Sequence, residues 1–191
     1  SFWAIYGIIA SVFLISRIPY AYLHKDDHTK VYANSDYPNV SIIIAAKNEK
    51  AGIFKTITTC VNSVYPGQIE CTVVDDGSTD GTKDEVVRAQ QVYGEKVKLI
   101  VFPGNKGKRE AMAAGIDKAL YEIIAFIDSD SFLAPDALRH ITEHFIENEK
   151  VAAVSGNTKA ENANTNLLTK MQSIQYAVSF DIYKASESVH R

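Results

Sequence analysis

Cysteine is scarce in this sequence. Two cysteines, Cys60 and Cys71, occur among 191 residues, and they do not form a C-x-x-C pair. Small secreted domains rely on several disulfides, and structural zinc sites need closely spaced Cys or His ligands. The sequence therefore indicates neither feature, and we expect both thiols to lie in the core of a protein from a reducing compartment.

Charge of one sign is not in excess either. The formal net charge is −3 at pH 7, and 23% of the residues are charged. Domains that bind nucleic acids carry a broad basic surface, because it pairs with phosphates. We therefore expect no nucleic-acid partner. A chain of 191 residues can hold one domain of ordinary size with a full hydrophobic core.

The N-terminal run lacks charge. Residues 2–16 read FWAIYGIIASVFLIS, and the first charged side chain is Arg17. The run is slightly shorter than the roughly 20 apolar residues that span a bilayer, and a signal peptide would begin with basic residues. We expect residues 1–23 to be part of a transmembrane helix and residues 24–39 to be a linker. Basic residues follow the run, so the positive-inside rule predicts a membrane protein whose remaining part lies in the cytosol. The alternative is a buried amphipathic helix.

Strand and helix patterns alternate from residue 40 onward. Apolar runs predict strands at 40–46, 69–74, 97–102, 122–128 and 151–156, and helical spacing predicts helices near 51–65, 82–93, 107–121 and 135–148. This alternation is typical of an α/β domain with a doubly wound, mostly parallel sheet and helices on both faces. Ligands of such sheets bind beyond the carboxyl ends of the strands, so we expect the site there.

Two common nucleotide-binding motifs are absent from those loops. No G-x-G-x-x-G follows the first strand, and GNKGKR at 104–109 lacks the first glycine and the final Ser or Thr of a P-loop. Dinucleotide-binding and P-loop folds are therefore excluded. Polar clusters nevertheless follow four strands: AAKNE, then Asp75 and Asp76, then PGNKGKRE, and DSD at 128–130. Their convergence on one edge of the sheet indicates a ligand site of another kind.

The stretch VVDDGSTDGT at 73–82 allows three interpretations. A calcium loop that starts at Asp76 would need a glutamate at its twelfth position, where this chain has Val87. A helix cap would employ one of the residues that follow the aspartates: Ser78, Thr79 or Asp80. That cap leaves Asp75 and Asp76 unexplained. A nucleotide site explains them, because a carboxylate accepts the N3–H of a uracil.

Asp128 and Asp130 stand one residue apart in a tight loop at the end of a predicted strand. Two carboxylates so placed can share one divalent ion, and Mg²⁺ or Mn²⁺ prefers such hard oxygen ligands together with substrate phosphates. As a Lewis acid the ion neutralises charge on a departing diphosphate. Lys108 and Arg109 would add positive charge for the phosphates. We therefore predict metal-assisted transfer from a nucleotide diphosphate.

Four motifs together resemble the family 2 glycosyltransferases with a GT-A fold, over about residues 38–160: VSIIIAAKNE, VVDDGSTDGT, GNKGKREAMAAGI and FIDSDSFLAPDAL. NKGKREAM and the segment from Ser155 are most similar to the membrane-embedded processive synthases of hyaluronan and chitin type. The resemblance implies an inverting transfer from a UDP-sugar, UDP-GlcNAc and also UDP-GlcA, to a growing β-linked polysaccharide. Mn²⁺ or Mg²⁺ would be the cofactor, and the lipid bilayer a further partner.

The same resemblance implies a role for each matching residue. The residues expected to bind the donor are Ala45, Lys47 and Glu49 beside the nucleoside, Asp75 or Asp76 at the uracil, and Lys108 near the base or diphosphate, with Arg109 adding charge. Asp128 and Asp130 would take the ribose and the metal. Lys159 would lie on the acceptor side.

A general base is missing from the pattern. An inverting transferase needs one to take the proton of the acceptor hydroxyl, and the processive members carry it in a T/G-[ED]-D motif followed by Q-x-x-R-W. Neither motif occurs here, and the later carboxylates, Glu161, Asp181 and Glu187, stand in no matching motif. We therefore expect the base beyond Arg191, in a longer enzyme. A non-processive transferase to a lipid phosphate and a donor-binding regulatory module without a base remain open as alternatives.

Apolar residues recur at helical spacing over 165–186. The spacing predicts an amphipathic helix within residues 161–191, leading toward the part that carries the base. Such a helix either lies at the membrane interface or covers a core, and the apolar pattern suits both. The nucleotide-sugar-binding domain itself is expected over residues 40–160.

Overall fold

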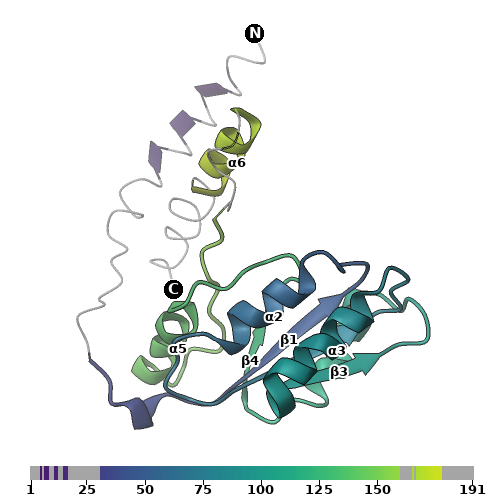
Figure 1. The fold of residues 1–191 in the computed structure, drawn as a ribbon. Coiled ribbons are helices and arrows are strands. Elements are labelled where there is room, and N and C mark those ends of the chain that lie inside the picture. The colour runs from purple at the N-terminus through teal and green to yellow at the C-terminus, as the bar shows by residue number, and fades with distance from the viewer. Residues whose placement is uncertain are drawn as a thin grey trace. The chain divides into compact units, whose positions relative to one another are not determined.

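The computed structural model describes residues 31–159, 165 and 167–177, and a few residues of an N-terminal helix (5, 7, 8, 11, 12, 15 and 16). The chain divides into two compact units. One runs from Tyr32 to Val154, and the other consists of Ser1–Val31 and Ser155–Arg191. The first unit contains the sheet and the helices that pack on it (Figure 1).

The sheet has four described strands, β1 (Val40–Ala46), β2 (Ile69–Asp75), β3 (Val97–Val101) and β4 (Ile123–Phe126). They run parallel in the order β3-β2-β1-β4. The two central strands are buried almost throughout, which explains why β1 is mostly apolar on both faces, while β2 also buries Glu70, Thr72 and Asp75. The parallel sheet predicted from the alternation of patterns is confirmed.

Helices cover both faces of this sheet: α2 (Ile53–Val61) and α3 (Thr82–Tyr93) on one face and α4 (Lys108–Ile116) on the other, while α5 (Ala137–Glu147) joins the core cluster through Leu138. Successive side chains of a strand point to opposite faces, and β1 shows the consequence. Ile42 and Ile44 join a core cluster with residues of α2 and α3. Ile43 meets α4 on the other face, so closely that a Cβ on Gly115 would lie 2.5 Å from its Cγ2. Both free cysteines, Cys60 and Cys71, are buried in the core as expected.

Two predicted elements were wrong. The run at 151–156 is not a strand, because it pairs with none of the four described strands, and its two alanines are exposed. An apolar run of low strand propensity does not become a strand without a neighbour to share its hydrogen bonds. The helix predicted to reach residue 121 ends at Ile116. Beyond it, side chains bind the backbone instead: Leu120 N–H donates to Glu70 and Tyr121 N–H donates to Ser41.

Glu70 organises the amino end of the sheet. Its carboxylate is buried and accepts hydrogen bonds from the Ser41 hydroxyl at 2.5 Å, the Lys98 ammonium at 2.6 Å and the Leu120 amide at 2.5 Å. Burial acts to raise the pKa of Glu70, but the bonds from Lys98 and Ser41 outweigh it and the pKa is lowered. One carboxylate thus joins β1, β2, β3 and the turn before β4, at the end of the sheet away from the predicted site.

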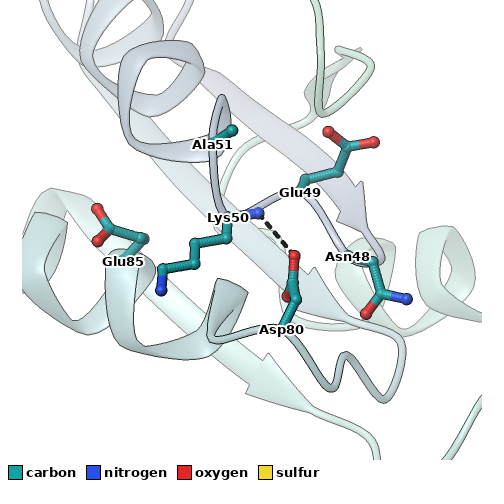
Figure 2. Close-up of a pocket in the computed structure, with 6 residues that line it drawn as sticks. All are labelled: Asn48, Glu49, Lys50, Ala51, Asp80 and Glu85. Atoms are coloured by element: carbon teal, nitrogen blue, oxygen red, sulfur yellow. Dashed lines mark hydrogen bonds between the residues drawn. The ribbon is translucent and has the colours of Figure 1, made fainter.

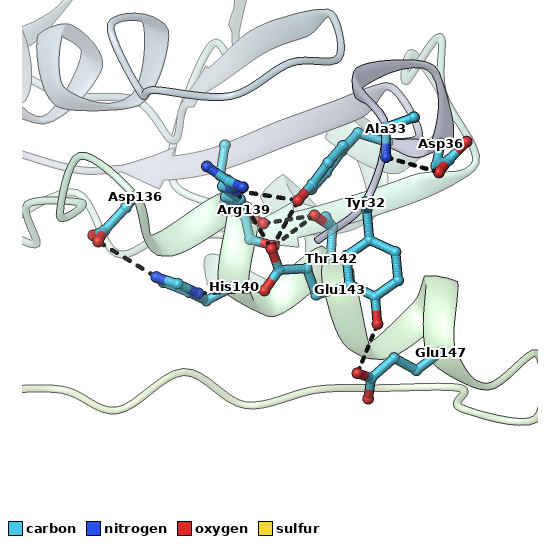
Figure 3. Close-up of polar contacts among 11 residues, drawn as sticks. Tyr32, Ala33, Asp36, Asp136, Arg139, His140, Thr142, Glu143 and Glu147 are labelled. Carbon is cyan, nitrogen blue, oxygen red and sulfur yellow. Dashed lines mark hydrogen bonds and ion pairs between the residues drawn. The ribbon is translucent and has the colours of Figure 1, made fainter. Parts of the chain in front are cut away.

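The segment before β1 is fixed on α5 (Figure 3). The Tyr37 hydroxyl donates to Glu143 Oε1 at 2.7 Å and accepts from Arg139 Nε at 3.1 Å. The Tyr32 hydroxyl donates to Glu147 Oε1 at 2.7 Å, and desolvation and this bond raise the pKa of Tyr32 to about 12. Burial acts to raise the pKa of Glu143, but the bonds from Tyr37 and His140 lower it overall. These polar side chains of α5 therefore attach the segment before β1 to the helix.

The second unit contains α6 (Leu167–Ala177), which confirms the central part of the helix predicted over 165–186. Of its predicted apolar stripe, Met171 and Ile174 are exposed. Residues 178–191 lie outside the described part, as does most of the predicted transmembrane segment 1–23. Within the described residues, no helix has the length and apolar character needed to cross a bilayer.

Candidate functional site

A cavity of about 390 Å³ opens where the four strands end. Its walls come from the end of β1 and from the segments after every strand: Ala45 and Ala46 in β1, Lys47 and Glu49 after it, Asp76 after β2, Asn105, Gly107 and Lys108 after β3, and Asp128, Ser129 and Asp130 after β4. The structure thus brings together Ala45, Lys47, Glu49, Asp76, Lys108, Asp128 and Asp130 of the predicted site residues. Asp75 and Arg109 do not line the cavity, and Lys159 belongs to the other unit.

The loops after β1 and β2 are joined by hydrogen bonds. Asn48 takes a positive φ of 56°, its amide donates to the Ser78 hydroxyl at 2.9 Å, and its side-chain oxygen accepts from the Thr79 amide at 2.9 Å. The Lys50 amide donates to Asp80 Oδ2 at 3.1 Å (Figure 2). Ser78, Thr79 and Asp80 therefore hold the loop after β1 (residues 47–50) in place, a role that sequence reasoning missed.

The interpretation that Ser78, Thr79 or Asp80 caps the helix was wrong, because the helix begins later in the sequence. The N-cap of α3 is Gly81, with a φ of 91°, and no side chain caps the helix. Asp80 Oδ1 instead accepts from the Thr82 amide at 3.0 Å and from the Thr82 hydroxyl at 2.5 Å. The bond from that hydroxyl is the main reason why the pKa of Asp80 is lowered. Asp80 therefore fixes both the start of α3 and the loop after β1.

The two adjacent aspartates have different surroundings. Asp75 is buried, and its carboxylate accepts from the Ser78 amide at 2.9 Å. Asp76 lines the cavity, and its two carboxylate oxygens accept from the amides of Lys106 at 2.6 Å and Gly107 at 2.9 Å. A carboxylate has about four acceptor positions, so Asp76 retains capacity toward the cavity.

Gly77 allows the loop after β3 to approach the loop after β2 closely. Its φ is +69°, and a Cβ at this position would lie 2.6 Å from the carbonyl carbon of Gly104. Only glycine satisfies both the conformation and the close approach of the two backbones. Asp76 and Gly77 together hold the loop that carries Lys108 toward the cavity.

Lys108 and Asp128 form an ion pair across the cavity. Lys108 Nζ lies 2.5 Å from Asp128 Oδ1, and both side chains are more than half exposed, at 63% and 62%. Arg109 follows Lys108 in the first turn of α4 and is exposed outside the cavity wall. Exposed pairs of this kind contribute little, about 0–1 kcal/mol. Lys108 is therefore able to exchange Asp128 for a phosphate at low cost.

Asp128 and Asp130 fit a divalent ion in part. Both carboxylates reach the same cavity and supply the hard oxygen ligands that Mg²⁺ and Mn²⁺ prefer. Across residues 31–159 and 167–177, no three His, Cys, Asp or Glu side chains gather to hold a metal. Two protein ligands leave the remaining coordination positions to water and to phosphate oxygens, which is the usual arrangement for Mg²⁺ at a phosphate site.

A second hollow, of about 530 Å³, borders the first and shares Glu49 with it. It is lined by Asn48, Glu49, Lys50, Ala51, Asp80 and Glu85 (Figure 2). The aspartates after β2 and β4 that line the first cavity are not part of its wall. Asp76, Asp128 and Asp130 therefore line the smaller cavity and not the larger one.

Comparison with known proteins gives consistent results. A family model described as glycosyl transferase family 2 matches residues 41–188. The poly-beta-1,6-N-acetyl-D-glucosamine synthase of Staphylococcus epidermidis is 30% identical over 192 residues, which cover 98% of this chain and 44% of that protein. The hyaluronan synthase of Streptococcus pyogenes is 28% identical over 191 residues, covering 97% and 44%. The chain therefore spans less than half the length of these relatives.

Solved structures agree on the fold. A mannosyltransferase from Pyrobaculum calidifontis, solved in complex with GDP-Man and Mn²⁺, is similar with a TM-score of 0.60 and 23% identity, covering 74% of this chain and 43% of that one. A structure of TarS from S. aureus gives a TM-score of 0.53 at 20% identity, covering 64% and 40%. The predicted GT-A fold is confirmed. Because the family model extends over most of the sheet and every loop that lines the cavity, the chain belongs to glycosyl transferase family 2, a family of enzymes.

Proposed function

We propose that the cavity at the carboxyl ends of the strands binds a UDP-sugar, as the donor site of a metal-dependent inverting glycosyltransferase. The observation that carries this proposal is that Asp76, Lys108, Asp128 and Asp130, from the segments that follow three different strands, line one cavity. Acceptors for a base, a cation for phosphate and ligands for a metal are the groups that a nucleoside diphosphate needs.

Asp76, rather than Asp75, is proposed to recognise the uracil. It faces the cavity, whereas Asp75 is turned to the Ser78 amide. The N3–H of uracil would donate to the acceptor capacity left on Asp76. The amides of Lys106 and Gly107 hold this carboxylate in one orientation, so little further ordering is needed when the base binds. Ala45, Lys47 and Glu49 are proposed to flank the nucleoside.

Asp128 and Asp130 would hold Mn²⁺ or Mg²⁺, which neutralises charge on the departing diphosphate when it is bound. Asp128 is also proposed to lie near the ribose. Lys108 would leave its pair with Asp128 and donate to a phosphate oxygen, a charge-assisted bond stronger than a neutral one. Arg109 contributes positive charge from outside the cavity wall, and the assignment of Lys159 to the acceptor side remains part of the proposal.

The whole protein is proposed to be a membrane polysaccharide synthase with its catalytic domain in the cytosol. Support comes from the relatives, which are named as synthases of poly-N-acetyl-glucosamine and of hyaluronan. UDP-GlcNAc is the proposed donor, with UDP-GlcA as a further candidate, and the acceptor is the growing β-linked chain. The general base that takes the proton of the acceptor hydroxyl is proposed to lie outside these 191 residues.

Calorimetry of UDP binding to the full 191-residue chain tests the donor site. UDP should bind in the presence of Mn²⁺ and bind much less tightly in EDTA. Asp130→Asn should weaken the Mn²⁺-dependent binding by roughly 10–100-fold, the range seen when the supporting groups of a metal are disturbed. Equal affinity with Mn²⁺ and with EDTA would exclude the metal role of Asp128 and Asp130.

A further inference from the structure

The segment that carries the D-S-D motif lies along α2 and is bound to it. The Thr56 hydroxyl donates to the Ser129 carbonyl at 2.9 Å, across 73 positions of the sequence. One turn further, the Thr59 hydroxyl accepts from the Leu133 amide at 3.1 Å. The Val64 amide, just after the helix, donates to the Pro135 carbonyl at 2.6 Å. The Ser63 hydroxyl also donates to the Pro135 carbonyl, at 3.0 Å, so four bonds fix the backbone of 129–135 from one helix and its C-terminal turn.

The bond from Thr56 acts at the centre of the motif. Ser129 stands between Asp128 and Asp130, so its carbonyl sets the plane of the peptide that leads into Asp130. On the other side, the Ile127 amide donates to the Ile43 carbonyl of β1 at 3.2 Å. The Ser131 amide closes the turn onto the Asp128 carbonyl at 3.0 Å. The two carboxylates are thus carried by a turn that is held by the sheet and by α2.

The geometry at Thr56 differs from that of an ordinary helical threonine. Such a hydroxyl usually donates to the carbonyl four residues earlier, as Thr58 does to Phe54 at 2.8 Å. The carbonyl four residues before Thr56 is that of Gly52, and it lies 3.4 Å from the Thr56 hydroxyl. The shorter hydrogen bond of this hydroxyl is therefore the one to the Ser129 carbonyl. Thr56 is fully buried at 0% exposure, so water cannot replace the hydroxyl.

We propose that Thr56 is a positioning residue for the donor site, one that aims Asp128 and Asp130 at the cavity through the Ser129 carbonyl. This inference rests on the proposed function, because it assumes that the two aspartates hold the metal bound to the diphosphate. Thr56 itself does not line the cavity. Valine has almost the same shape as threonine and no hydroxyl, so Thr56→Val frees the turn without opening a cavity in the core.

The test measures UDP binding by calorimetry, with Mn²⁺ and with EDTA, together with thermal unfolding of each variant. The variants of the full chain are Thr56→Val, the rescue variant Thr56→Ser, and the control Thr58→Val, which removes a hydroxyl bonded only to Phe54 and Tyr93. Thr56→Ala replaces the valine variant if that variant does not fold. Thr56→Val should weaken Mn²⁺-dependent binding roughly tenfold or more, while serine restores it to within about twofold of wild type.

Thr58→Val should bind within about twofold of wild type, although both valine variants are expected to unfold at a lower temperature. The loss at Thr56 should be confined to the Mn²⁺-dependent part, because Asp76 belongs to another loop. Wild-type affinity in Thr56→Val, an equal loss in Thr58→Val, or no rescue by serine would each overturn the inference. Failure of the proposed function looks different: the wild-type chain itself would then bind UDP equally with Mn²⁺ and EDTA.

Discussion

At the scale of single residues, Asp75 and Asp76 show how two identical neighbours acquire different tasks. Both are almost fully buried, but Asp75 closes a turn onto the Ser78 amide, and Asp76 faces the cavity. The turn after β2 accounts for the difference, because the Ser78 amide occupies Asp75, whereas the amides of Lys106 and Gly107 hold Asp76 at the cavity. A role in base recognition can therefore be tested separately from a role in folding.

The first prediction concerns the choice of base. Cytosine carries an acceptor at N3, and a carboxylate facing it leaves both groups unsatisfied, at a cost of about 1–3 kcal/mol. UDP should therefore bind more tightly than CDP by roughly fivefold to 150-fold, as measured by calorimetry. Asp76→Asn should bring the ratio of the two affinities close to one, because an amide can donate to cytosine N3.

Asp75→Asn is the matched control for this ratio. Asp75 does not line the cavity, so the substitution is expected to lower the melting temperature and to leave the preference for UDP unchanged. Similar affinities of wild type for CDP and UDP would remove the proposed role of Asp76.

The second prediction concerns Lys108, which pairs with Asp128. Under the proposed function, Lys108→Gln would remove a cation that competes with the metal for Asp128, and also a donor to the phosphates. Mn²⁺ should therefore bind the free variant at least as tightly as wild type, whereas UDP with saturating Mn²⁺ should bind roughly tenfold more weakly. The control is Lys118→Gln, which removes the same charge at an exposed position beyond the end of α4. If Lys108→Gln weakens Mn²⁺ binding, the lysine helps to organise the metal ligands instead of competing with the ion.

At the scale of elements, the site is assembled by loops that bind one another. The loop after β2 contacts the loop after β1 through Ser78, Thr79 and Asp80, and the loop after β3 through Asp76 and Gly77. The strands bring the loops to one edge, and these bonds then fix the conformation of each loop. Displacement of one loop should therefore affect donor binding as a whole.

Gly77→Ala is the third prediction. The left-handed φ of +69° costs an L-residue about 1–2 kcal/mol, and the added Cβ would also meet the backbone of Gly104 at 2.6 Å. The free energy of unfolding, measured with urea, should fall by roughly 2–4 kcal/mol, and UDP affinity should fall with it. Gly81→Ala is the control: φ is +91°, but the nearest atom to its Cβ is a lysine methylene at 3.5 Å. Only the conformational cost is expected there, so equal losses in the two variants would contradict the close approach of the loops.

The sequence predicted the elements better than it predicted their ends. Runs rich in apolar residues located all four described strands, and periodicity placed α3 at Thr82–Tyr93. The end of α4 was wrong because Glu70, some 50 positions away, binds the Leu120 amide. The run at 151–156 was wrong because periodicity says nothing about whether a pairing partner exists. Such long-range contacts are not encoded in a local pattern.

The candidate site was predictable to a similar degree. The rule that ligands bind at the carboxyl ends of parallel strands brought seven predicted residues to one cavity. The choice between Asp75 and Asp76 required the structure, because it depends on which carboxylate the turn to Ser78 occupies. The role of Thr56 had no sequence signal, since a threonine on the buried face of a helix is unremarkable by itself.

At the scale of the whole molecule, acid should weaken the fold through Glu70 and Glu143. Both have a lowered pKa in the folded chain. A lowered pKa means that the stabilisation is complete above the unfolded value of about 4.3 and is lost as the pH falls through the folded value. The free energy of unfolding, measured with urea, should therefore be constant near pH 6–7 and should decrease steadily below about pH 4.

The fourth prediction is tested with Glu70→Gln, because Glu70 is expected to be the main source of this pH dependence of stability. The variant should be less stable than wild type at pH 7, because the Lys98 ammonium and the Leu120 amide lose a charged acceptor. The difference should narrow as the pH falls, because wild type loses the same charge by protonation. Glu149→Gln, at an exposed position, should match wild type throughout. A difference that stays constant down to pH 3 would mean that Glu70 acts by shape and not by charge.

The fifth prediction concerns the complete protein that contains this chain. In lipid vesicles, with UDP-GlcNAc and Mn²⁺, it should make a polymer of high mass without a soluble primer, because a processive enzyme holds its product between additions. The measurement is radiolabel from UDP-GlcNAc, with and without UDP-GlcA, resolved by size. Label found only in a short lipid that organic solvent extracts would favour a non-processive transfer to a lipid phosphate.

The position of β4 in the sheet makes the cavity depend on the last of the four described strands to be synthesised. β4 pairs with β1, with Val40 opposite Ile123, and lies on the side of β1 opposite to β2 and β3. Contacts between such distant parts of a chain close slowly, because the entropy of a long loop is lost before the contact stabilises anything. During synthesis, three strands leave the ribosome before the fourth. Because Asp128 and Asp130 follow β4, a chain whose fourth strand has not paired with β1 lacks two of the carboxylates that line the cavity.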